Sequence, residues 1–261
     1  MKELINNNEM KIMMSERLAN DTHNPNNEKL GELVLKKTID KFNLYRKIFN
    51  VDKLEKVEFI IFDKQEEYRE FYRKLNKKEL PEYAKGSFEP KINLSYSYQQ
   101  GIPLYKSSLW YNFIANPSHE AFHLYYKKYI YKDERIVWFD EGLAQYFSGE
   151  RDMYLESEEK LRELFTNFKD SYKPISNLNE RIQGNNDISD DLIFERKNVF
   201  SGYNVSFLII KYIVDNYGEE YLITLMKDNN KIRTLGNTAI NDMLEYYTNK
   251  YNLNTQKTFL N

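Results

Sequence analysis

The stretch His119-Glu120-Ala121-Phe122-His123 decides how the rest of this 261-residue chain is interpreted. Residues four apart lie on one face of an α-helix, so the two imidazoles point the same way if the stretch is helical. Asn116 and Pro117 come just before it. Either a helix begins here, with Asn116 as N-cap and Pro117 at its first position, or a longer helix is kinked at the proline. Both alternatives keep the stretch within one helical turn.

Two imidazoles on one helical face are a pair of ligands for one metal ion. The chain has no cysteine and only three histidines, so any metal must be held by histidine and carboxylate groups. Glu120 is one step along from His119, beside the metal rather than at a ligand position, where it can take a proton from water and return it to a leaving amine. The alternative is a chance pair of histidines near a glutamate on an amphipathic helix. His23, the third histidine, lies in an Asn-rich stretch far upstream and is not expected to be a ligand.

Catalytic zinc usually has three protein ligands and one water, so a third ligand is needed. The candidate is Glu141, in the apolar segment 137–147. Asp140 can cap a helix there, which puts Glu141 in the first turn; a contact from Asp140 to a ligand or to substrate is the alternative. Gly142 and Ala144 are small, so this helix can approach the histidine helix closely.

At this point the chain resembles the gluzincin metallopeptidases, whose signature is His-Glu-x-x-His followed by Glu on a second helix. Seventeen residues separate His123 from Glu141. The segment Trp138-Phe139-Asp140-Glu141-Gly142-Leu143-Ala144 is similar to the Trp-x-x-Glu-Gly-x-Ala segment of thermolysin-like and aminopeptidase-like gluzincins. The resemblance implies that His119, His123 and Glu141 hold one Zn²⁺ and that Glu120 is the general base of a zinc peptidase.

The resemblance also suggests a group that stabilises the oxyanion of the reaction. Aminopeptidase-like gluzincins use a tyrosine on a later helix, and Tyr203, 62 positions past Glu141, opens an apolar run similar to that helix. This sequence departs from the gluzincin pattern at two places. The Gly-x-Met-Glu-Asn strand that anchors a substrate amine is missing, and Gln145 stands where a carboxylate often orients a zinc histidine.

The composition limits the classes of partner. The 38 Lys and Arg residues nearly balance the 40 Asp and Glu residues, so no net charge favours nucleic acid or an anionic membrane. The expected partner is a peptide or protein substrate. No apolar stretch is long enough for a signal or a membrane span, so a cytoplasmic protein is the default. A secreted protein whose signal has been removed would look the same.

The periodicity predicts an α+β fold, and the resemblance implies that this fold is of the zincin-like kind. Residues 1–19 look weakly helical, and a longer helix is expected over 28–49. Strands are expected at 57–62, 86–88 and 91–98, with a helix near 65–75. Segment 91–98 is the candidate edge strand that pairs with an extended peptide. Further helices are expected near 108–129, 140–149, 154–168, 199–217, 219–228 and 237–250, with Gly218 as a C-cap.

These elements predict three ranges: a helical extension (1–50), a small α/β lobe carrying the histidine helix (51–139) and a helical lobe carrying the third ligand (140–261). Residues 169–198 are expected to form an irregular connection, and the active-site cleft is expected between the lobes. The predicted function is zinc-dependent hydrolysis of peptide bonds. The alternatives are an inactive zinc-binding scaffold of the same fold and a zinc hydrolase of a non-peptide bond.

Overall fold

The chain has an α+β fold made of two compact units. The computed structural model describes residues 1–79, 86–89, 91–131, 135–171, 199–236 and 238–253. The first unit comprises Met1–Lys132 and Phe147–Asp152, and the second comprises Asp133–Tyr146 and Met153–Asn261. Each is described by itself. The three ranges expected from the sequence, 1–50, 51–139 and 140–261, stay a prediction about domain boundaries.

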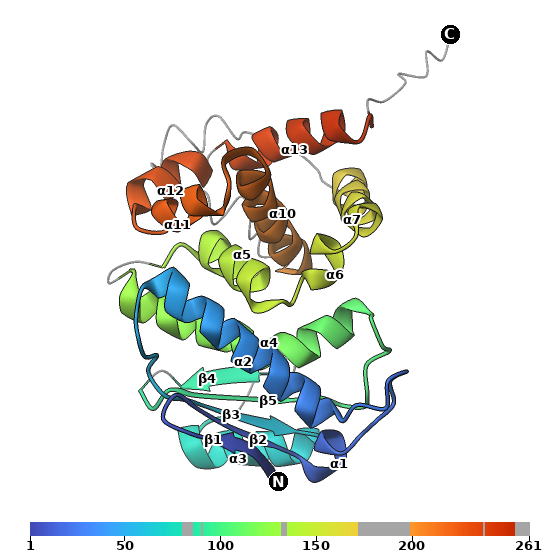
Figure 1. Cartoon of the computed structure of the whole chain (residues 1–261), viewed down its shortest axis with the longest axis vertical. Helices are drawn as coiled ribbons and strands as arrows, with labels where there is room; N and C mark the ends of the chain where they lie inside the picture. Colours follow the sequence, from blue (N-terminus) through green and yellow to red (C-terminus); the bar gives the residue numbers. More distant parts are fainter. Residues whose placement is uncertain (80–85, 90, 132–134, 172–198, 237, 254–261) are drawn as a thin grey trace. The chain divides into compact units, whose positions relative to one another are not determined.

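The first unit is built on a five-stranded sheet with the order β1-β2-β3-β5-β4 (Figure 1). Its strands are β1 (Lys2–Asn6), β2 (Met10–Met14), β3 (Val57–Phe62), β4 (Gly86–Glu89) and β5 (Leu94–Tyr98). The central pairs β2–β3 and β3–β5 are parallel, while β1 and β4 run antiparallel to their neighbours. The three strands expected from the sequence are confirmed as β3, β4 and β5.

Two expectations about these strands are wrong. Residues 1–19 do not form a weak helix: they contain the hairpin β1–β2 and only a short helix, α1 (Glu16–Ala19). The Asn7 side chain accepts hydrogen bonds from the backbone of Glu9 and Met10, which closes the turn between the strands. Segment 91–98 is not an edge, because β5 lies between β3 and β4.

Helices cover both faces of this sheet. Neighbouring residues of β3 point to opposite faces, so Ile61 packs with α2 (Leu30–Phe49) and α4 (Ser108–Tyr129), whereas Phe62 packs with Tyr68 of α3 (Gln65–Asn76). Figure 1 shows α2 lying along α4 on one side of the sheet and α3 on the other. The unit therefore has three layers, and α4 lies with α2 in the helical layer on one face of the sheet.

The second unit is helical and is organised around α10 (Val199–Tyr217). Seven of its residues are almost completely inaccessible to solvent: Val205, Ser206, Phe207, Leu208, Ile209, Ile210 and Ile213. A helix that is apolar on all sides is buried by its neighbours. These are α5 (Val137–Ser148), α7 (Glu158–Ser171), α11 (Glu219–Leu225) and α13 (Ala239–Lys250), as Figure 1 shows.

Most helix boundaries agree with the periodicity. The segments 108–129 and 199–217 are confirmed, as is the long helix over 28–49, which begins at Leu30. Gly218 ends α10 with φ +82°, as expected of a C-cap glycine. The short helices α6 (Asp152–Leu155) and α12 (Asn229–Gly236) were not expected. Most of the irregular connection expected at 169–198 lies outside the described residues. No helix in the described ranges combines the length and apolar character needed to cross a membrane.

Candidate metal centre

The histidine stretch lies in the middle of one long helix. Helix α4 begins after Ser107, whose hydroxyl accepts a hydrogen bond from the Trp110 amide at 3.2 Å, and it continues through Pro117 to Tyr129. The alternative in which a helix begins at Asn116 is therefore wrong. His119 and His123 are four residues apart, about one turn, in a helix that has already made about three turns before reaching them.

Aromatic packing fixes which face of α4 the histidines use. Phe122, between the two histidines, contacts Tyr45 of α2 with ring centroids 5.4 Å apart, and Tyr125 contacts Phe42 at 5.6 Å. The Tyr45 hydroxyl also donates to the carbonyl of Ser118 at 2.9 Å. Because these residues turn one side of α4 towards α2, the imidazoles lie on another side, where both rings are half-buried.

The two imidazoles converge on one point. The Nε2 atoms of His119 and His123 are 3.1 Å apart, and the rings are almost perpendicular, at 82°. Two nitrogens, each about 2.0–2.1 Å from one tetrahedral zinc ion, are about 3.3 Å apart. Two imidazole nitrogens at this distance also need a proton or a cation between them, since two lone pairs repel. The donor set thus fits a single metal ion.

Glu120 lies next to His119 on the same turn of α4. Its side chain is partly accessible to solvent, and in the described part of the chain no hydrogen bond or ion pair occupies its carboxylate. A general base must be available to accept a proton, whereas a carboxylate that serves only the fold is normally paired.

A fourth residue, Glu150, which the sequence interpretation missed, contacts the pair. Its Oε2 atom lies 2.6 Å from Nδ1 of His119, and both side chains are nearly buried, with 14% and 13% of their surface exposed. Gln145 stands at the position, four past Glu141, where the resemblance led us to expect a carboxylate of this kind. It lies elsewhere: its side-chain nitrogen donates to the backbone carbonyl of Tyr203 at 3.1 Å.

Glu141, the expected third ligand, lies in α5, and its carboxylate is oriented by an arginine. Helix α5 begins at Val137, so Asp140 is inside the first turn and the expectation that it caps the helix is wrong. Arg135 pairs with Asp140 through Nε and with Oε1 of Glu141 through Nη2, the latter at 2.7 Å. Burial lowers the pKa of the Arg135 guanidinium, but the two carboxylates raise it more, so the net pKa lies above its ordinary value.

Gly142 allows α5 to touch α10. A Cβ atom at this position would lie 2.7 Å from Cγ1 of Ile210 and 2.8 Å from the carbonyl oxygen of Ser206. The small residue was expected to admit the histidine helix; the described contact is with α10 instead. Tyr203 lies in the first part of α10 and is half-buried.

The expected site residues are thus divided between the units: His119, Glu120 and His123 belong to the first, and Glu141 and Tyr203 to the second. His23 lies in an exposed loop, where its ring nitrogen contacts Asp21 at 2.9 Å.

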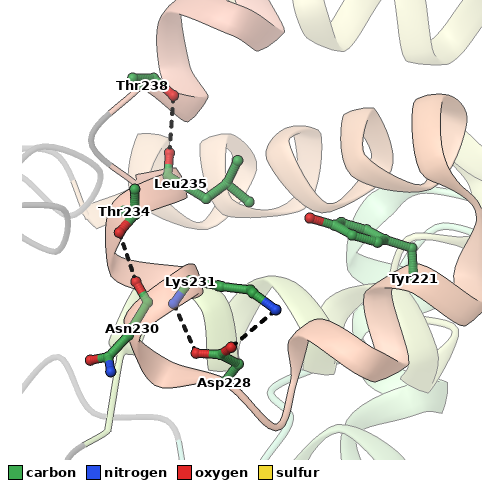
Figure 2. Close-up of a pocket in the computed structure, with 7 residues that line it drawn as sticks. All are labelled: Tyr221, Asp228, Asn230, Lys231, Thr234, Leu235 and Thr238. Carbon is green, nitrogen blue, oxygen red and sulfur yellow. Dashed lines mark hydrogen bonds and ion pairs between the residues drawn. The ribbon is translucent and has the colours of Figure 1, made fainter.

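A hollow of about 540 Å³ in the second unit involves none of these residues (Figure 2). Its polar groups are satisfied by their own helices: Lys231 pairs with Asp228 at 3.3 Å, and Thr234 donates to the Asn230 carbonyl. Figure 2 shows these contacts among the side chains that line the hollow. The hollow therefore offers no set of convergent groups for a ligand.

The chain matches no protein-family model, and no curated protein matches it.

Proposed function

We propose that this protein is a zinc-dependent peptidase in which His119, His123 and Glu141 hold one Zn²⁺ ion and Glu120 is the general base. The observation that carries the proposal is the convergence of two Nε2 atoms, 3.1 Å apart, beside an unengaged carboxylate on the same helical turn. Among the described residues, His119, His123 and Glu141 are the one group of three or more histidine and acidic side chains that could hold a metal ion.

The continuity of α5 supports a ligand set drawn from both units. Residues 147 and 148 end this helix and belong to the first unit. Phe147 stacks on Phe122 of α4, with centroids 5.6 Å apart, and the backbone carbonyl of Ser148 accepts a hydrogen bond from Ser118 at 3.0 Å. Glu141 is six positions earlier in the same helix, about 9 Å along its axis. The last two residues of the helix that carries the carboxylate therefore pack on the helix that carries the imidazoles.

Each group has one chemical task in this proposal. His119, His123 and Glu141 would hold the zinc ion, which would supply a lowered pKa of bound water, about 7, and polarisation of a substrate carbonyl. Glu120 accepts the proton of the attacking water and delivers it to the departing amine. Tyr203 donates a hydrogen bond to the oxygen that becomes negative as the carbonyl is attacked. Glu141 contributes one oxygen as a ligand while Oε1 keeps its ion pair with Arg135.

Replacement of Glu120 by Gln tests the proposal. The variant should keep stoichiometric zinc, measured by elemental analysis, while hydrolysis of a fluorogenic peptide library falls at least about 100-fold, the lower end for loss of a general base. Glu156→Gln is the matched control, because Glu156 is an exposed carboxylate and its loss should leave both measurements unchanged.

Other outcomes separate the alternatives. If the unaltered chain holds stoichiometric zinc but hydrolyses no peptide, the inactive zinc-binding scaffold is favoured. If it then cleaves esters or amides outside peptides, the zinc hydrolase of a non-peptide bond is favoured instead. Absence of zinc after gentle purification refutes the proposal. Peptides with free and blocked N-termini, tested side by side, distinguish an aminopeptidase from an endopeptidase.

A further inference from the structure

We infer that Glu150, assisted by Asn112, is a positioning residue that fixes the tautomer and orientation of His119 for metal binding. This inference rests on the proposed function, because it assigns a role to residues around the same site. It starts from the ion pair between Oε2 of Glu150 and Nδ1 of His119, 2.6 Å apart and nearly buried. A carboxylate at that nitrogen favours the tautomer with its proton on Nδ1, which leaves the Nε2 lone pair towards His123.

The other oxygen of Glu150 is engaged from the histidine helix itself. The Asn112 amide, turned so that its nitrogen faces acceptors, donates to Oε1 of Glu150 at 3.3 Å and to the Ser108 carbonyl at 2.9 Å. Asn112 is seven residues before His119, two turns along one face of α4. The carboxylate is thereby held between two side chains of this helix, and its rotation is restricted.

The backbone that carries Glu150 is built to reach back to α4. Gly149 follows α5 with φ +88°, a conformation that residues with a side chain rarely adopt, and it reverses the chain. The Glu150 amide donates to the Ser148 hydroxyl at 3.2 Å. Asp152 then pairs with Lys37 of α2 at 2.6 Å. The loop is thus tied to both α4 and α2. A Cβ atom added at Gly149 would lie within 3.0 Å of Lys37 and Asp152.

Zinc affinity and the tautomer of His119 test this role. Zinc titration against a chromophoric chelator should show binding about 10- to 100-fold weaker in Glu150→Ala, the range for losing a partner of a ligating histidine. Glu150→Gln should fall between this variant and the unaltered chain, because its amide oxygen can accept a hydrogen bond from Nδ1 but carries no negative charge. Asn112→Ala should weaken zinc binding less than Glu150→Ala does. Glu156→Ala, which removes an exposed carboxylate, should bind zinc like the unaltered chain.

The second measurement does not need metal. With three histidines in the chain, ¹⁵N NMR of the imidazoles resolves each ring. In the metal-free chain His119 should be protonated at Nδ1, and Glu150→Gln should shift it towards a mixture of tautomers. If zinc affinity and the His119 tautomer are both unchanged in the Glu150 variants, the inference is wrong and the proposed function stands. If the unaltered chain binds no zinc, the proposed function fails, and this inference fails with it.

Discussion

Gly142 marks the place where α5 passes closest to α10, and replacing it with alanine measures how tightly the helix of Glu141 is held. The added Cβ would lie 2.7 Å from Cγ1 of Ile210, 2.8 Å from the Ser206 carbonyl oxygen and 3.0 Å from the Ser206 carbonyl carbon. Ordinary contacts between carbon atoms are about 3.5–4.0 Å. The Ile210 side chain can rotate away, but the Ser206 carbonyl belongs to a buried helix backbone, so α5 itself must shift.

Two opposing effects determine how much Gly142→Ala changes the free energy of unfolding. Overpacking of a core costs about 1–3 kcal/mol, and a clash with backbone belongs in the upper half of that range. Alanine regains about 1 kcal/mol over glycine within a helix. We therefore expect Gly142→Ala to lower the free energy of unfolding by about 1–2 kcal/mol. The displacement also moves Glu141, the preceding residue, so zinc should bind more weakly.

Urea denaturation of the metal-free chain, followed by far-ultraviolet circular dichroism, measures the first effect. A double-mutant cycle with Ile210→Ala separates the two contacts that make up this loss of stability. Alanine at position 210 removes the 2.7 Å contact with Cγ1 and leaves the contact with the Ser206 carbonyl. The cost of Gly142→Ala should fall by at least about 0.5 kcal/mol in that background without disappearing. A Gly142→Ala chain as stable as the unaltered one, or more stable, would show that α5 does not approach α10 this closely.

Three further predictions concern other parts of the fold. Arg135→Gln removes the guanidinium from Asp140, whose side chain is 1% exposed, and should lower the free energy of unfolding by about 2 kcal/mol in a urea titration. This loss is smaller than that for breaking a fully buried ion pair, because the Arg135 side chain is 40% exposed. Gly218→Ala meets no atom within 4 Å but keeps φ +82°, so backbone strain alone should lower stability by about 1–2 kcal/mol in the same assay. Burial raises the pKa of Glu9, but hydrogen bonds from Arg46 and the Leu54 amide lower it more, for a net decrease. Glu9 therefore stabilises the fold above its unfolded pKa of about 4.5, and this contribution disappears as the pH falls through the folded value. Thermal unfolding between pH 6 and pH 3 should accordingly show a smaller loss of stability for Glu9→Gln than for the unaltered chain.

Periodicity predicted the elements whose burial is one-sided or complete. β3 and α10 are largely apolar runs bounded by polar residues, and α4 repeats apolar and aromatic residues at helical spacing, so each could be placed from local sequence. The hairpin β1–β2 was missed although Met10, Ile12 and Met14 alternate, because the strands are short and β1 has no fully buried residue. The order of strands in a sheet is a property of the tertiary structure, and for that reason the segment chosen as an edge proved to be internal.

In the candidate site, too, local sequence relates neighbouring residues but does not predict contacts between distant ones. His119, Glu120 and His123 share one helical turn, and local spacing alone relates them. Glu150 is 31 positions from His119 and is one of 40 acidic residues, so no spacing rule selects it. Its only local sign is the preceding glycine at the end of α5, which indicates a reversal of the chain but not where the next side chain will point.

The Arg135 contacts give a physical reason why Asp140 and Glu141 occur together. A single carboxylate held against a guanidinium would be neutralised by it, whereas two carboxylates that share one arginine keep negative charge that this arginine does not balance. A cation bound by two neutral imidazoles gains from such a charge, and Glu141 supplies it through an atom that can also be a ligand. Asp140→Asn should therefore weaken zinc binding although Asp140 is not a proposed ligand, and zinc titration of this variant measures the effect. Equal affinity in the variant and the unaltered chain would mean that Asp140 serves the fold alone.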